Sequence, residues 1–88
     1  MKVVVLYRPN SDHGRTVDEY IENFRSRVSD QRIEVLSIDT REGSSMATLY
    51  DIVRYPAIMV LRSDGAMQKA WEGIELPLID EVQSYARS

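Results

Sequence analysis

One short stretch, Ser11-Asp12-His13, places a hydroxyl, a carboxylate and an imidazole side by side, and these are the three groups of a serine hydrolase. The spacing argues against that chemistry. Three consecutive residues of one loop do not set the base between nucleophile and carboxylate and also leave an oxyanion hole. The Gly-x-Ser-x-Gly pattern of many hydrolases is absent as well. We therefore interpret His13 as a solvated loop residue or as a cap of the following helix.

The composition excludes several other chemistries. The chain has no cysteine and one histidine, which rules out disulfides, thiolate nucleophiles and thiolate-bound metals and makes a site of several imidazoles implausible. A net charge of −3 argues against nucleic acid as the main ligand, because phosphate contacts need clustered cations. The longest apolar runs, about five residues, are too short to span a membrane. We expect no metal, no cofactor, no nucleic acid and no membrane among its ligands.

Length and composition predict a single domain over residues 1–88. A chain of this size buries roughly 60% of its unfolded surface, and 43% apolar residues can form a core without metal or disulfide. Met1-Lys2-Val3 leads directly into strand-like sequence, which indicates no secretory signal and predicts a cytoplasmic location. We expect a monomer or a weak homodimer.

Hydrophobic periodicity predicts the elements that must position the loop. A β-branched run over residues 2–8 predicts a buried strand, and residues 33–38 predict a second one. Between them, apolar residues at helical spacing predict a helix from about Arg15 to Ser29. The apolar stripe of this helix consists of Val17, Tyr20, Ile21, Phe24 and Val28.

A short helix should follow. Gly43-Ser44-Ser45 offers N-cap chemistry, and Pro56 should end the helix, because the residue before a proline is pushed out of the helical region. Its apolar face would carry Met46, Leu49, Tyr50 and Val53.

The last third of the chain predicts a hairpin and a helix. Residues 57–62 and 66–71 flank the turn Ser63-Asp64-Gly65, and Gly73 breaks the second strand. Pro77 suits the first turn of a final helix. The apolar face of that helix would carry Leu78, Ile79, Val82, Tyr85 and Ala86.

The resulting βαβαββα order predicts an α/β fold with one mixed four-stranded sheet and helices on both faces. With the loop Pro9 to Gly14, the Tyr55-Pro56 step, the Asp64-Gly65 turn and Gly73, this order resembles the thioredoxin superfamily from Lys2 to about Ala86. That superfamily normally carries Cys-X-X-Cys where this chain has Ser11 to Gly14. Because a serine cannot form the mixed disulfide, thiol–disulfide exchange is excluded, and we lean against an enzyme.

The resemblance implies a cis peptide bond before Pro56, facing the Ser11 to Gly14 loop. Such a bond would leave the backbone of Tyr55 able to pair with an extended peptide as an added strand. The simpler alternative is that Pro56 only ends a helix. The resemblance points to a redox-inactive domain that binds a peptide or protein through a groove formed by Arg8, Ser11, Asp12, His13, Gly14, Arg15, Tyr55 and Pro56.

Two other classes of function stay open. Arg8 lies three residues before Ser11, where glutaredoxins often carry a lysine that binds glutathione, and some glutathione transferases use a serine at a position like Ser11. The Glu-Ser pair and the helical second domain of those transferases are missing. A simpler interpretation pairs Arg8 and Arg15 with nearby carboxylates such as Asp12 and Asp18. Such ion pairs on a protein surface contribute little to stability. The third class is a structural or assembly protein.

Overall fold

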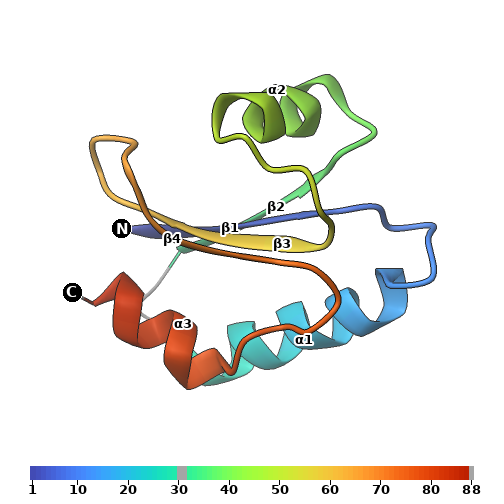
Figure 1. The fold of residues 1–88 in the computed structure, drawn as a ribbon. Helices are drawn as coiled ribbons and strands as arrows, with labels where there is room; N and C mark the ends of the chain where they lie inside the picture. The colour runs from blue at the N-terminus through green and yellow to red at the C-terminus, as the bar shows by residue number, and fades with distance from the viewer. Residues whose placement is uncertain (30–31, 88) are drawn as a thin grey trace.

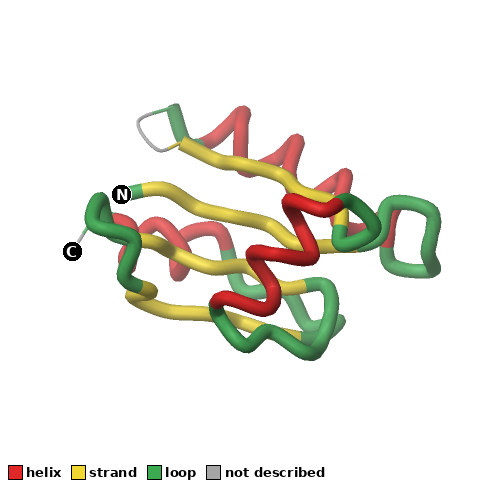
Figure 2. The backbone as a smooth tube through the Cα atoms, turned by 90° about the horizontal axis from the view of Figure 1, so that it is seen from above, coloured by secondary structure: helices red, strands yellow, loops and turns green. Residues whose placement is uncertain are grey.

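The computed structural model describes residues 1–29 and 32–87, and one four-stranded sheet organises them. Its strands are β1 (Lys2–Tyr7), β2 (Arg32–Ser37), β3 (Ala57–Leu61) and β4 (Met67–Glu72), side by side in the order β2-β1-β3-β4 (Figure 2). Strand β1 runs parallel to β2 and antiparallel to β3, and β3 is antiparallel to β4. The predicted mixed sheet is confirmed.

Helices cover both faces of this sheet, as predicted. Helices α1 (Gly14–Arg27) and α3 (Ile79–Ala86) lie on one face and α2 (Arg41–Leu49) on the other (Figure 1). Side chains of a strand alternate between faces, so Val3 and Val5 pack with α1 and α3 while Val4 and Leu6 pack with the α2 side. Each of these four side chains is at most 1% exposed, which contributes about 1.5–3 kcal/mol per side chain.

Helix α2 differs from the predicted helix at both ends. It begins earlier because Thr40 is the N-cap, its Oγ1 accepting the N–H of Gly43 at 3.0 Å. It ends at Leu49 because Asp51 adopts a left-handed conformation with φ of 56°. The N–H of Ile52 then donates to the carbonyl of Ala47 at 2.8 Å, which is the bond of a Schellman motif.

Two predictions about this helix are therefore wrong. Pro56 does not end it, since the Schellman motif ends it first. Val53 lies beyond the helix and is 73% exposed, like Leu49.

The last helix also starts later than predicted. Leu78 is the N-cap of α3, so Pro77 precedes the helix instead of standing in its first turn. Leu78 is 75% exposed and does not belong to the apolar face, which buries Ile79, Val82 and Ala86. Among the described residues, no helix has the length and apolar character needed to cross a membrane.

The end of β4 is tied to the segment that precedes β3. Gly73 ends β4 with φ of 106°, as predicted for a strand breaker, and its N–H donates to the carbonyl of Pro56 at 2.9 Å. The Glu72 carboxylate accepts the backbone N–H groups of Val53 at 3.1 Å and Arg54 at 3.2 Å. These bonds hold residues 53–56 beside the loop that follows β4.

Candidate functional site

The end of β1 and the start of β3 bring the two predicted loops to the same end of the sheet. Leu6 of β1 is paired with Ala57 of β3, so the loop after Tyr7 and the segment before Ala57 lie next to each other. The Tyr55-Pro56 peptide bond is cis, as the sequence resemblance implied.

Two hollows are present at this end of the molecule, one on each side of the Tyr55-Pro56 step. The first recess, of about 550 Å³, has Pro56 in its wall on the side of α1. Its lining residues are Asp12, His13, Thr16, Val17, Pro56, Ile74 and Leu76. Four of these seven side chains are apolar, and Ile74 is 77% exposed. A ligand side chain with apolar surface would be shielded from water here.

The second recess, of about 400 Å³, has Tyr55 in its wall on the side of α2. Its lining residues are Arg8, Ile38, Ser44, Ala47, Thr48, Asp51, Ile52, Val53 and Tyr55. The eight predicted site residues are therefore not the walls of one groove. Arg8 and Tyr55 line the second recess, Asp12, His13 and Pro56 line the first, and Ser11, Gly14 and Arg15 line neither.

The backbone of Tyr55 is unpaired at this end of the sheet. Its N–H and C=O make no hydrogen bond within residues 1–29 and 32–87, although its hydroxyl donates to the carbonyl of Ile52 at 3.1 Å. The neighbouring Pro56 carbonyl, in contrast, already accepts from Gly73. An unpaired donor and acceptor on one residue can pair with an added strand.

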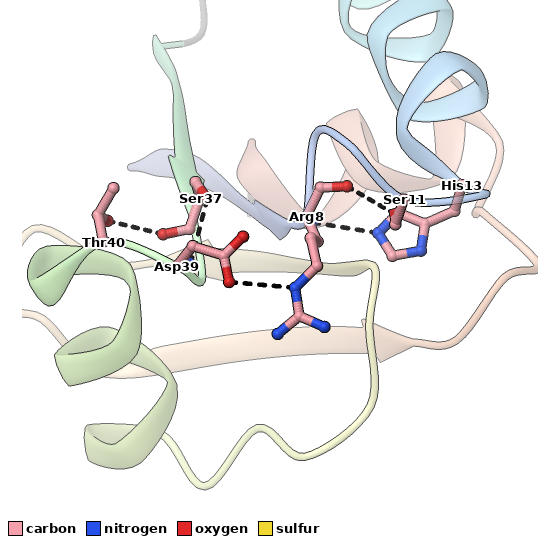
Figure 3. Close-up of polar contacts among 6 residues, drawn as sticks. All are labelled: Arg8, Ser11, His13, Ser37, Asp39 and Thr40. Carbon is pink, nitrogen blue, oxygen red and sulfur yellow. Dashed lines mark hydrogen bonds and ion pairs between the residues drawn. The ribbon is translucent and has the colours of Figure 1, made fainter.

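Arg8 organises the loop after β1 (Figure 3). Its backbone N–H donates to Nε2 of His13 at 3.1 Å, and its Nε donates to Oδ1 of Asp39 at 3.1 Å. Its carbonyl accepts from the hydroxyl of Ser11 at 2.6 Å and from the Ser11 N–H at 3.2 Å. Arg8 does pair with a carboxylate, as the simpler interpretation held, but its partner is Asp39 on the loop after β2 and not Asp12.

This network excludes serine hydrolase chemistry, because the hydroxyl proton of Ser11 is already used in a hydrogen bond. The Ser11 hydroxyl donates to a carbonyl and not to His13, so no nucleophile–base pair exists. His13 occupies the N-cap position of α1, but its side chain does not cap the helix. Because its Nε2 accepts from Arg8, the neutral ring carries its proton on Nδ1.

A Tyr7–Asp18 contact that the sequence did not predict joins the end of β1 to α1. The hydroxyl of Tyr7 donates to Oδ1 of Asp18 at 2.6 Å, and Arg15 makes no ion pair with Asp18 among the described residues. Burial, and then the hydrogen bond to Asp18, raises the pKa of Tyr7 to about 12. The available signal was a tyrosine at the end of an otherwise aliphatic strand, opposite a helix with a carboxylate in its early turns.

Gly14 has a packing role. It is buried, and a Cβ atom on it would lie 1.9 Å from the carbonyl oxygen of Pro9. Only glycine allows α1 to begin this close to the loop.

Sequence reasoning missed four residues that line the first recess: Thr16, Val17, Ile74 and Leu76. The helical periodicity predicts Val17 as a core residue, and its side chain is 1% exposed. Periodicity therefore did not indicate that Val17 also lines the first recess. Ile74 and Leu76 follow Gly73 directly, and the turn at Gly73 was the signal that this segment folds back toward Pro56. Within the described part of the chain, no cluster of His, Asp or Glu could hold a metal ion.

Comparison with known proteins shows a likeness to solved structures and none to known families or curated sequences. The structure is similar to thioredoxin 1 from the thermophilic eubacterium Thermosipho africanus TCF52B, with a TM-score of 0.71 and 17% identity over 99% of this chain and 91% of that one. At this identity the likeness shows the fold alone. The chain thus has a thioredoxin-like fold, and it has it without a single cysteine.

Proposed function

We propose that this domain is a redox-inactive binding protein that takes an extended peptide segment of a partner at Tyr55 and the first recess. The observation that carries the proposal is the unpaired backbone of Tyr55, which stands beside a recess with mainly apolar walls. The absence of cysteine supports the redox-inactive part, because no side chain of this chain can form a mixed disulfide.

An extended peptide can bind both to the Tyr55 backbone and in the first recess. Its N–H and C=O groups point sideways and can bond with Tyr55, while alternate side chains point to opposite faces. One of those side chains can then enter the first recess beside Pro56 and cover Ile74, which is 77% exposed in the free domain. Covering a large apolar side chain contributes about 1.5–3 kcal/mol.

Amide shift mapping with pools of short synthetic peptides tests the proposal. We expect shifts at Tyr55, Gly73 and Ile74, with few elsewhere. Ile74→Ser should weaken binding about tenfold, the loss expected when an apolar contact of about 1.4 kcal/mol is removed.

Leu49→Ser is the matched control, because Leu49 is also strongly exposed, at 73%, but lines neither recess. It should leave affinity unchanged. Shifts confined to the face covered by α2, or an equal loss in both variants, would refute peptide binding at the first recess.

A second candidate is a glutathione-type small molecule in the second recess. Arg8 lines this recess and bonds Asp39 through Nε only, so its terminal nitrogens make no hydrogen bond among the described residues. A carboxylate ligand could bind them. The Ser11 hydroxyl, however, already donates to the Arg8 carbonyl and would have to leave it to stabilise a thiolate. Titration with millimolar glutathione that leaves Arg8, Thr48 and Tyr55 unperturbed would exclude this candidate.

A further inference from the structure

We propose that the ligand side chain entering the first recess is a lysine or arginine, and that the Asp12 carboxylate binds its charged end. This inference rests on the proposed peptide binding and goes beyond it, since it specifies the chemistry of the partner segment.

The walls of the first recess match the two parts of such a side chain. Val17, Pro56, Ile74 and Leu76 are apolar, and Asp12 is the one acidic residue of the lining. Lysine and arginine bury their methylene stems along apolar surface while the charged end stays at the edge. A purely apolar side chain would fill the recess but make no use of the Asp12 charge.

Asp12 is free to act in this way. Its carboxylate makes no hydrogen bond or ion pair within residues 1–29 and 32–87. Arg15, the nearest arginine in sequence, makes no ion pair with it in this part of the chain, and Arg8 is bonded to Asp39 instead. Asp12 is exposed and adjoins His13, whose Nε2 is occupied by the Arg8 N–H.

The surrounding charge favours the same occupant. The four loops at this end of the sheet, residues 8–13, 38–40, 50–56 and 73–78, carry four carboxylates and two guanidinium groups. These are Asp12, Asp39, Asp51 and Glu75 against Arg8 and Arg54. With Arg15 at the start of α1 added, the four carboxylates still exceed three guanidinium groups, so a cation is favoured over an anion.

Three capped peptides that differ at one position test the inference. The probes are acetylated and amidated Thr-Val-X-Val-Thr, where X is lysine, norleucine or glutamate. Norleucine keeps the stem of lysine and lacks the ammonium group. We expect the lysine peptide to bind about threefold more tightly than the norleucine peptide, as for an exposed ion pair, and the glutamate peptide to bind most weakly. The preference should shrink as salt is added.

Asp12→Asn should reduce the affinity for the lysine peptide to that for the norleucine peptide. Glu75→Gln is the matched control, since Glu75 adjoins Ile74 and Leu76 but does not line the recess. It should keep the preference. The peptide and salt measurements use the unaltered protein, so the test does not depend on the folding of a variant.

The outcomes separate the two proposals. Equal affinity for the lysine and norleucine peptides, with shifts still at Tyr55 and Ile74, would overturn the role of Asp12 and leave peptide binding in place. No shift at these residues with any of the three peptides or with the pools would overturn both.

Discussion

The two recesses lie on opposite sides of one dipeptide, Tyr55-Pro56, yet the fold uses their polar groups differently. In the second recess, Arg8 is bonded to Asp39 and its backbone holds Ser11 and His13. In the first recess, Asp12 has no partner among the described residues, and Ile74 is 77% exposed. The comparison separates side chains that build the loop from side chains that stay available to a ligand.

The largest effect should come from Gly14, the buried first residue of α1. Gly14→Ala would place a Cβ atom 1.9 Å from the Pro9 carbonyl oxygen, so the loop or the helix must move. We expect a loss of roughly 2–3 kcal/mol in the free energy of unfolding, as for an overpacked core site. Urea denaturation measures it. Ser45→Ala on exposed α2 surface is the control and should change stability by less than about 0.5 kcal/mol.

Tyr7→Phe should have the next largest effect, because it removes the hydrogen bond from β1 to Asp18 of α1. A hydrogen bond to a charged group is worth about 1.5 kcal/mol here, at the low end of its range because Asp18 is exposed. Thermal or urea unfolding at neutral pH measures the loss. An unchanged stability would mean that the Tyr7 hydroxyl does not hold α1 against β1.

Tyr7→Phe should also change how the stability of the protein depends on pH. The pKa of Tyr7 is raised to about 12 in the folded protein, above its ordinary value of 10, so the fold favours the neutral hydroxyl. This contribution to stability is complete below pH 10 and disappears as pH rises from 10 to 12. Tyr7→Phe should therefore flatten the fall in stability over that window. It should not abolish the fall, because burial also raises the pKa of Tyr20 to about 12.

Glu72→Ala should mainly affect the segment between the recesses. The Glu72 carboxylate accepts the N–H groups of Val53 and Arg54, so its removal should cost about 1 kcal/mol and speed amide exchange at both residues. Glu75→Ala, at an exposed carboxylate with no partner in the described residues, is the control. Equal exchange in both variants would show that Glu72 does not hold this segment.

The smallest effect should be a gain in stability, from Tyr20→Phe. The Tyr20 hydroxyl is buried and has no hydrogen-bond partner within residues 1–29 and 32–87. Removing an unpaired buried polar group relieves its desolvation penalty, so Tyr20→Phe should raise stability by roughly 0.5 kcal/mol. The contrast with the loss in Tyr7→Phe separates a bonded from an unbonded tyrosine, and a destabilised Tyr20→Phe would contradict it.

The fold could be predicted from the sequence because its signals are local. The continuous apolar run of β1 predicts a strand covered on both faces, and the stripe of α1 predicts a helix with one buried side. The ends of α2 could not be predicted, since apolar spacing continues to Val53 while the backbone turns at Asp51, a residue with a Cβ atom that adopts a left-handed conformation. Only the Schellman bond from Ile52 to Ala47 explains that turn.

The site was predictable in part. Pro56 and the loop from Ser11 to Gly14 were found because their order along the chain resembles a known fold. The division into two recesses depends on the path of residues 73–78, which no periodicity describes. The roles of Arg8 and Asp12 depend on which carboxylate a long side chain reaches across space, and Asp39 lies 31 residues from Arg8.

Amide hydrogen exchange at Tyr55 tests the central claim most directly. The claim is that a peptide pairs with this backbone as an added strand, so saturating peptide should slow exchange of the Tyr55 N–H strongly. The Val53 N–H, which Glu72 already holds, should keep its rate. If a bound peptide leaves exchange at Tyr55 unchanged while other amides become protected, peptide binding occurs elsewhere and the account is wrong.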